Sequence, residues 1–289
     1  MKKVMITGIA GGFGKPTALA LLAKGYDVAG SVRSRSGKNA ATVAELEAAG
    51  AKIVEMDVTD AASTERGVAD AISQLGGLDI LFNNAGIGSY GIQELMSPED
   101  MTRVFDVNVM GVQRVMRAAL PHMRAQGRGT VLYTSSLIGR IATPFYGTYS
   151  ASKWALEAIV ECYRTELSGF GIESCIIEPG AMPTAFFDGL VAPNDVAREA
   201  EYGDFAAVPA MSNAGLAQML EATPMQRPER IAETVVALLD MPFGQKPFRT
   251  VVDHVGVGPE IERYNDVLHD VTRTILTNFG IAEMLDLNA

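Results

Sequence analysis

Short β-rich segments alternate with longer helical segments through most of the chain. The alternation predicts strands at residues 4–6, 27–32, 52–56, 78–82, 130–134, 173–177 and 249–252. It predicts helices at residues 12–24, 40–49, 61–74, 101–124, 149–168 and 228–239. Strands that alternate with helices of this length form parallel βαβ units. The sequence therefore predicts an α/β fold, a doubly wound parallel sheet with helices on both faces, which binds ligands beyond the carboxyl ends of its strands.

The composition is that of an ordinary globular protein, since 48% of the 289 residues are apolar and 20% are charged. No apolar run reaches the roughly 18 residues of a membrane span. Glycines interrupt the apolar start of the chain, so we expect a strand there rather than a signal peptide. The net charge of −10 argues against nucleic acid or an anionic membrane as partner, because both need a basic surface. Two cysteines are too few for a disulfide framework, which favours a cytoplasmic protein.

We expect a single domain over residues 1–255, followed by a C-terminal helical extension over 256–289 with an amphipathic segment at about 259–279. The regular pattern is interrupted between residues 181 and 230, where prolines and large apolar side chains occur without clear periodicity. A long irregular insertion in a compact domain is usually functional or disordered. Its apolar content predicts a lid over a hydrophobic substrate, and an oligomer contact is the alternative.

A glycine-rich segment, Thr7-Gly8-Ile9-Ala10-Gly11-Gly12-Phe13-Gly14, joins the first predicted strand to the first predicted helix. In this position glycines permit a tight turn and let the backbone approach a pyrophosphate at the helix N-terminus, where free N–H groups attract anions. Two patterns fit at once, T-G-x-x-x-G-x-G through Gly12 and T-G-x-x-G-x-x-G through Gly11. The segment predicts a nucleotide-binding turn, and other residues must decide between the two patterns.

Tyr149 and Lys153 lie four positions apart in a segment that is predicted to be helical. This spacing places both side chains on one face of the helix, about 5–6 Å apart at Cβ. An ammonium beside a phenol favours the ionised phenol, so we expect the pKa of Tyr149 to fall from about 10 toward neutral pH. Such a tyrosine can donate or accept a proton. Without further motifs, however, a tyrosine and a lysine at this spacing more often lie on a solvated helix face.

With the motif Asn83-Asn84-Ala85-Gly86, the glycine turn and the Tyr149/Lys153 pair, the chain resembles the short-chain dehydrogenase/reductase family over roughly residues 3–185. The resemblance implies a Rossmann-type fold and an oxidoreductase activity. It implies a catalytic set of Asn108, Ser136, Tyr149 and Lys153. The cofactor-binding residues that it implies are Gly8, Gly11, Gly12, Phe13, Gly14, Arg33, Asp57, Val58, Asn84, Ala85, Gly86, Tyr149, Lys153, Pro179, Gly180 and Thr184.

Ser136 precedes Tyr149 at the spacing of the standard-length members of that family. This spacing, the Asn83–Gly86 motif and the modest chain length favour the standard-length branch over the longer sugar-nucleotide epimerases and dehydratases. Such an epimerase or dehydratase stays as one alternative. A cofactor-binding regulator without catalysis is the other, and the complete catalytic set argues against it.

The resemblance also implies a role for each member of the catalytic set. Tyr149 exchanges a proton with the oxygen of a carbonyl or an alcohol during a hydride transfer that uses NAD(P)(H). Lys153 lowers the pKa of Tyr149 and binds the nicotinamide ribose. Ser136 hydrogen-bonds the substrate oxygen and so stabilises the charge that develops there. Asn108 anchors a water that links Lys153 to solvent.

The end of the second predicted strand bears on the choice of cofactor. NAD-specific members of the family usually carry an acidic residue there, whereas this chain reads Ser31-Val32-Arg33. Three basic side chains follow in a short stretch, Arg33, Arg35 and Lys38, and the next acid is Glu45. In a chain with a net charge of −10 this cluster suits a 2′-phosphate. The sequence therefore predicts NADP(H), with NAD(H) as the alternative.

The predicted substrate is a hydrophobic ketone or aldehyde, or the corresponding alcohol. The residues that we expect to bind it are Ser136, Ile138, Phe145, Tyr149, Met182 and Phe186. The segment Tyr149–Glu157 is similar to that of the hydroxysteroid and retinol dehydrogenase-like members. Family resemblance further implies a homodimer or homotetramer packed through the helices at 101–124 and 149–168, and we expect no metal.

Overall fold

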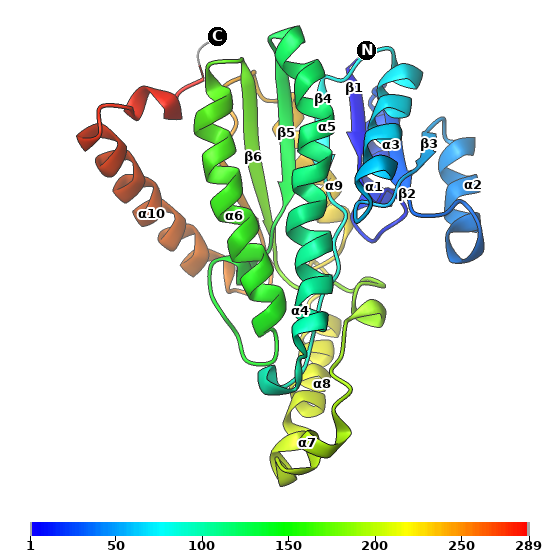
Figure 1. The fold of residues 1–289 in the computed structure, drawn as a ribbon, viewed down its shortest axis with the longest axis vertical. Helices are drawn as coiled ribbons and strands as arrows, with labels where there is room; N and C mark the ends of the chain where they lie inside the picture. The colour runs from blue at the N-terminus through cyan, green and yellow to red at the C-terminus, as the bar shows by residue number, and fades with distance from the viewer. Residues whose placement is uncertain (1, 288–289) are drawn as a thin grey trace.

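The computed structural model describes residues 2–287. Its centre is a parallel sheet of seven strands in the order β3-β2-β1-β4-β5-β6-β7 (Figure 1). The strands are β1 (Lys3–Ile6), β2 (Asp27–Val32), β3 (Lys52–Glu55), β4 (Ile80–Asn83), β5 (Gly129–Thr134), β6 (Ile172–Pro179) and β7 (Arg249–Val252). β2 and β3 lie on one side of β1, and β4 to β7 lie on the other. The strand order therefore reverses between β1 and β4, and ligands bind at such a point in sheets of this kind. The predicted fold class is confirmed.

Helices cover both faces of the sheet. One face carries α1 (Gly14–Ala23), α2 (Ala40–Ala48) and α9 (Glu229–Asp240), and the other carries α3 (Ala61–Leu75), α5 (Gly111–Gln126) and α6 (Gly147–Ser168). Successive side chains of a strand point to opposite faces. In β1, accordingly, Val4 and Ile6 pack in the core on the side of α1, α2 and α9, while Met5 packs in the core on the side of α3, α5 and α6. Burial on both sides explains the apolar runs Val4–Ile6 of β1 and Ile80–Phe82 of β4.

The helix predicted over residues 101–124 is present, but a π turn that the sequence did not predict divides it. Helix α4 (Pro98–Phe105) is followed by one π-helical turn, Asp106–Met110, and then by α5. A capping box at Ser97 and Asp100 begins α4 three residues earlier than predicted. π turns inside helices are frequent at functional sites, and this one contains Asn108.

Residues 181–230, which the sequence suggested to be irregular, are partly helical. They contain α7 (Val196–Ala200) and α8 (Val208–Glu221), with short 3₁₀ turns at Phe187–Gly189 and Gly203–Ala207. The prediction failed at α8 because Pro209 resembles a helix breaker. In fact it occupies the first turn of α8, where a missing N–H costs nothing. Figure 1 shows α7 and α8 projecting past one end of the sheet.

The C-terminal segment forms α10 (Gly258–Asn278) and a 3₁₀ turn, Ala282–Leu285, close to the predicted bounds of 259–279. Only three residues of α10 are buried, and all of them lie in its first half: Gly258, Ile261 and Asn265. Figure 1 shows α10 leaning away from α6. No helix within residues 2–287 is both long enough and apolar enough to cross a membrane.

Leu81 tests the double-sided core, because it lies at the centre of β4 with no solvent exposure. We expect Leu81→Ala to lower the free energy of unfolding by about 2–5 kcal/mol through the lost contacts and the cavity that remains. Met211→Ala on α8 is the matched control, since Met211 is 71% exposed, and should change it by less than about 0.5 kcal/mol. Urea titration of both variants measures the difference, and similar values for the two would contradict this core.

Candidate active site

A cleft with a volume of about 1590 Å³ lies at the carboxyl ends of the strands. Nearly all the predicted site residues line it. They are Gly8, Gly11, Gly12, Phe13, Arg33, Asp57, Val58, Asn84, Ala85, Gly86, Ser136, Ile138, Phe145, Tyr149, Lys153, Pro179, Gly180, Met182, Thr184 and Phe186. Two predicted residues, Gly14 and Asn108, do not line the cleft. Both lie one layer behind it, so their predicted roles would have to act through neighbours.

The glycine turn is shaped by contacts that leave no room for side chains. Gly8 has a left-handed backbone (φ +66°), and a Cβ there would lie 3.1 Å from Ala85 Cα. A Cβ on Gly14 would lie 2.5 Å from the Gly8 carbonyl oxygen, and one on Gly12 would lie 2.6 Å from Thr184 Cβ. At Gly11 the nearest atom would be 3.2 Å away, which is less restrictive. The spacing through Gly12 and Gly14 is therefore the one that the packing enforces.

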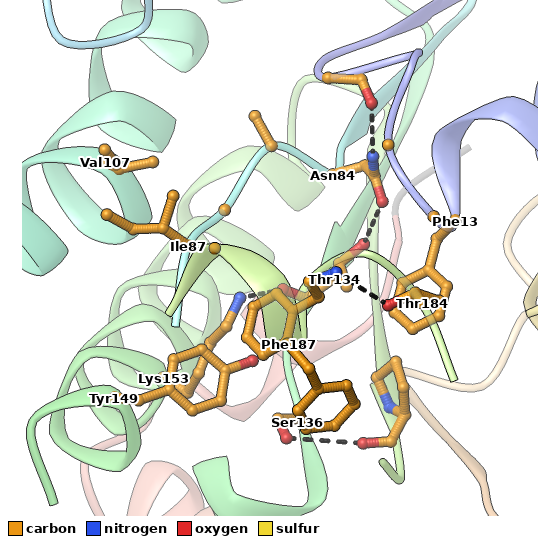
Figure 2. Close-up of a pocket in the computed structure, with 18 of the residues that line it drawn as sticks. Phe13, Asn84, Ile87, Val107, Thr134, Ser136, Tyr149, Lys153, Thr184 and Phe187 are labelled. Carbon is orange, nitrogen blue, oxygen red and sulfur yellow. Dashed lines mark hydrogen bonds between the residues drawn. The ribbon is translucent and has the colours of Figure 1, made fainter. Parts of the chain in front are cut away.

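Asn84 ties three strand ends together beneath the cleft (Figure 2). Its side-chain amide donates to the Thr7 carbonyl at 3.0 Å, and its carbonyl accepts from Thr134 Oγ1 at 3.4 Å. The backbone N–H of Asn84 in turn donates to Thr7 Oγ1 at 2.9 Å. These bonds hold the glycine turn, the Asn83–Gly86 turn and the end of β5 in one arrangement. Asn84 thus shapes the cleft as well as lining it.

The basic cluster predicted for a 2′-phosphate is divided in the structure. Arg33 and Lys38 line the cleft, but Arg35 does not. Arg35 donates to the Ile53 carbonyl at 2.9 Å and pairs with Glu47. Nearby, burial acts to raise the pKa of Asp57, but hydrogen bonds from Thr59 and the charge of Arg33 outweigh it, so that pKa is lowered. Asp57 is thus held as an anion at this end of the cleft.

Lys153 is buried and donates to the Thr134 carbonyl at 2.8 Å (Figure 2). Burial lowers the pKa of its ammonium to about 8, although the negative charge of Glu157 acts in the opposite direction. Asn108 accepts from the Ile87 N–H at 2.9 Å and donates to the Ile87 carbonyl at 2.8 Å. A Cβ on Gly86 would lie 3.2 Å from Asn108 Oδ1 and 3.7 Å from Lys153 Nζ. Gly86 therefore separates the two side chains by little more than its own backbone.

The pKa of Tyr149 contradicts the sequence-based prediction. Burial raises this pKa above its usual value, and a hydrogen bond with Ser136 offsets only part of the rise. Lys153 Nζ is 5.7 Å from the centroid of the Tyr149 ring and donates to backbone rather than to the phenol. The prediction weighed the nearby ammonium and left out the desolvation that comes with a buried site. Ser136 itself lies within reach of the Pro179 carbonyl, at 3.5 Å.

Apolar side chains line the cleft beyond Tyr149. The Phe186 ring packs against Tyr149 at 5.5 Å between centroids and against Phe187 at 5.7 Å. Three cleft residues on α8 escaped the sequence analysis because that segment was read as irregular: Ser212, Leu216 and Met219. Their spacing of four and three residues, which marks one helix face, was the available signal. Phe145 is the one non-glycine residue with positive φ (70°) between residues 2 and 287.

Comparison with known proteins decides the family. The model of the family described as short chain dehydrogenase matches residues 2–194. The chain belongs to the short-chain dehydrogenase/reductase family. As a member of this family it is an NAD(P)-dependent oxidoreductase. The glycine turn, the Asn83–Gly86 motif and the Tyr149/Lys153 pair all lie within the matched residues.

Several curated relatives are about a third identical to the chain over the part that aligns. A 3-ketodihydrosphingosine reductase of Bacteroides thetaiotaomicron is 35% identical over 70% of this chain and 71% of its own. A 17-beta-hydroxysteroid dehydrogenase type 1 of Mus musculus is 36% identical over 65% of this chain and 56% of its own. An NADPH-dependent 3-dehydrocapnine reductase of Ornithobacterium rhinotracheale is 30% identical over 71% and 74%.

Solved structures resemble nearly the whole chain. A short-chain dehydrogenase from Streptomyces avermitilis matches with a TM-score of 0.74 and 29% identity, covering 97% of this chain and 96% of its own. An alcohol dehydrogenase from Thermococcus sibiricus, complexed with 5-hydroxy-NADP, matches with a TM-score of 0.69 and 27% identity over 87% and 96%. The cleft described above fits a dinucleotide, because Gly8, Gly12 and Gly14 leave the turn backbone bare at the start of α1.

Gly8 gives a direct test of the turn. Gly8→Ala places a side chain in left-handed backbone, at about 1–2 kcal/mol, and drives its Cβ against Ala85 beside the cleft. We expect the dissociation constant for NADPH, measured by fluorescence titration, to rise at least about tenfold. Gly25→Ala is the control, since Gly25 has a similar φ (+80°) with no atom within 4 Å of the added Cβ. Equal losses of binding in both variants would count against a nucleotide at this turn.

Proposed function

We propose that the protein is an NADP(H)-dependent reductase or dehydrogenase that interconverts a hydrophobic ketone or aldehyde and its alcohol. One observation carries the proposal. Tyr149 lines one continuous cleft together with Ser136, Lys153, the glycine turn and apolar side chains such as Phe186, and it lies one helical turn before Lys153 on α6. A proton donor at the boundary of a nucleotide site and an apolar pocket suits carbonyl reduction.

The residues of the chain divide the chemistry between them. When bound, NADP(H) supplies or accepts the hydride. Tyr149 gives a proton to the substrate oxygen in reduction and takes it back in oxidation. Ser136 donates a hydrogen bond to the same oxygen and so stabilises developing negative charge. Lys153, as an ammonium, favours the phenolate that Tyr149 becomes, and its burial strengthens that interaction.

Asn108 is proposed as an indirect participant. It lies behind Gly86 rather than in the cleft, bonded to the Ile87 backbone and to Ser152 Oγ at 3.0 Å. From there it can hold the turn at Gly86 against Lys153 and support a water between Lys153 and solvent. Gly14 contributes in a similar way, by letting α1 approach the turn closely. The remaining residues predicted to bind cofactor are proposed to contact it directly.

NADP(H) is favoured over NAD(H) by Arg33 and Lys38. Both line the cleft at the end of β2, where a 2′-phosphate would need positive charge. The relatives and structural neighbours include NADPH- or NADP-linked and NAD-linked proteins, as their names state. The absence of an acid at the end of β2 supports the first group.

The substrate is proposed to be apolar and extended. Ile138, Phe145, Met182 and Phe186 line the cleft with the face of α8 formed by Ser212, Leu216 and Met219. We propose that residues 181–230 act as its lid, because α8 forms one wall without joining the sheet. Relatives that reduce a ketodihydrosphingosine or oxidise a hydroxysteroid, as they are named, act on molecules of this character.

We further propose a cytoplasmic homodimer or homotetramer. Both cysteines are free, with Cys175 buried and Cys162 exposed. The outer face of α6 carries Trp154, which is 40% exposed, and small residues that would allow close packing of a second copy. Light scattering that gives the mass of one chain would overturn the oligomer.

Tyr149→Phe tests the proton transfer. The variant keeps the ring and its packing on Phe186 but has no proton to exchange, so we expect kcat to fall about 10²–10⁴-fold with the NADPH dissociation constant nearly unchanged. Tyr163→Phe is the control on the same helix, because the Tyr163 hydroxyl donates to Gln113 on α5 instead. NADPH consumption over a panel of carbonyl compounds gives the measurement. Substantial residual turnover in Tyr149→Phe would exclude this tyrosine as the proton donor.

Arg33→Ala tests the cofactor choice. We expect the KM for NADPH to rise about tenfold or more, because a charge-assisted contact to the 2′-phosphate is lost, while the KM for NADH changes little. Arg35→Ala is the matched control, since Arg35 binds Glu47 and the Ile53 carbonyl outside the cleft. A wild-type protein that prefers NADH would refute the assignment.

A further inference from the structure

A group of buried charged side chains lies behind the catalytic residues, away from the cleft. We refer to Arg140, Glu157, Glu178, Arg249 and Asn265 as the buried ion cluster. The side chains of Glu157 and Glu178 have no solvent exposure, and those of Arg140 and Arg249 are 4% and 8% exposed. Burying so many charges is costly unless they are paired and hydrogen-bonded. None of the proposed catalytic roles uses these residues.

The two arginines bridge the two buried glutamates. Arg249 Nε donates to Glu157 Oε2 at 3.0 Å and lies 3.6 Å from Glu178 Oε1. Arg140 approaches the same two carboxylates at 3.5 and 3.6 Å. Glu161, 31% exposed, pairs with both arginines at the edge of the cluster. The carboxylates and guanidinium groups thus form one connected network.

Asn265 brings the C-terminal helix into this network. Its side-chain N–H donates to Glu178 Oε2 at 2.5 Å, and its carbonyl accepts from Arg140 Nε at 3.2 Å. It is one of three buried residues of α10 and lies in the first half of that helix. The aromatic ring of Tyr264, the preceding residue, lies 5.8 Å from the Arg140 guanidinium. Helix α10 is therefore anchored to the molecule through the buried ion cluster.

Each charged member near the cleft is attached to a segment that carries a proposed catalytic group. Arg140 follows Ser136 by one short turn, Glu178 directly precedes Pro179, and Glu157 lies one helical turn after Lys153. A Cβ on Gly139 would lie 3.3 Å from Lys153 Cβ and 3.6 Å from Glu157 Cγ. The buried ion cluster thus connects these three segments on the side away from the cleft. Its member Glu157 lies close to the Cβ end of the Lys153 side chain.

The charge on Lys153 needs such support. Its ammonium is buried and donates a hydrogen bond to a neutral carbonyl, that of Thr134. Glu157, at i+4 on the same helix, is the negative charge that acts to keep the lysine protonated. Burial and repulsion from Glu157 raise the pKa of Glu178, so Glu178 carries less of the negative charge near neutral pH. Glu157 is left as the main counter-charge to Lys153.

We propose that Glu157 is a positioning residue that keeps Lys153 charged during turnover, and that Asn265 makes this support depend on the docking of α10. The inference rests on the proposed function for the role of Lys153. Glu157 touches neither cleft nor substrate and acts through the lysine alone. Glu161, one turn further along α6 and partly exposed, shares the same arginines but is screened by solvent. It should support Lys153 far less.

The direction in which the loss of Glu157 should shift the pH profile follows from the charges near Lys153. The groups that face the two glutamates are Arg140 from the loop after β5, Arg249 from β7, Glu161 from α6 and Asn265 from α10. The ammonium form of Lys153 is lost as the pH rises through its pKa of about 8. Removing the negative charge of Glu157 lowers that pKa further. The alkaline loss of activity should then begin at a lower pH.

Glu157→Gln is the first test. We expect the alkaline limb of kcat/KM, measured with NADPH and the apolar ketone 2-decanone, to move down by roughly one to two pH units. The same shift is expected in the pH dependence of the NADPH dissociation constant, measured by fluorescence in the full-length protein. Glu161→Gln is the matched control, and its alkaline limb should stay within about 0.3 units of wild type. A purely structural role of Glu157 would lower stability and kcat without moving the limb.

Asn265→Leu is the second test, because it leaves every charge in place. We expect the limb to move in the same direction by a smaller amount, since Glu178 and Arg140 lose the amide that holds them. If Glu157→Gln does not fold, this variant decides. The inference is overturned if the limbs of Glu157→Gln and Asn265→Leu match wild type, or if Glu161→Gln moves as far as Glu157→Gln. A wild type that binds NADPH but reduces no carbonyl compound defeats the proposed function instead, and the binding titration still tests Glu157.

Discussion

Parallel pairing of the strands is the constraint on which the rest of the structure depends. It places the carboxyl ends of all the strands at the same edge of the sheet, so residues far apart in sequence meet in one cleft. The hydrogen bonds of Asn84 to Thr7 and Thr134 then hold the ends of β1, β4 and β5 in register at that edge. The glycine turn follows β1 and the Ser136 segment follows β5, so the same hydrogen bonds set the distance between these two segments.

Desolvation governs the electrostatics of the site. Burial raises the pKa of Tyr149 and lowers that of Lys153, so in each case it disfavours the charged form. The same low-dielectric surroundings make each remaining charge more effective, because little solvent screens it. The negative charge of Glu157, which does not line the cleft, therefore acts on the pKa of Lys153.

Local sequence patterns were sufficient for much of the fold and the cleft. The alternation of strands and helices, the glycine turn and the family motifs depend on backbone geometry within short segments, and they predicted the sheet and most of the cleft lining. Two of the failures share a cause, because each depends on what surrounds a residue in three dimensions. The π turn places Asn108 behind Gly86, and burial reverses the direction expected for the pKa of Tyr149. Likewise, nothing local pairs Asn265 with Glu178, since 87 positions separate them. The missed helix α8 differs, since Pro209 in its first turn is a local signal.

The match to the family model ends at residue 194, well before α10 begins. Through Asn265, however, α10 contacts the carboxylate of Glu178 and the guanidinium group of Arg140, which both lie within the matched residues. A sequence change in this outer helix can therefore alter the hydrogen bonds of buried charged residues in the part of the chain that the family model matches, while leaving each of those residues in place. Trimming the chain before Asn265 would remove a polar partner from a buried network of charges, which is a different operation from shortening a surface tail.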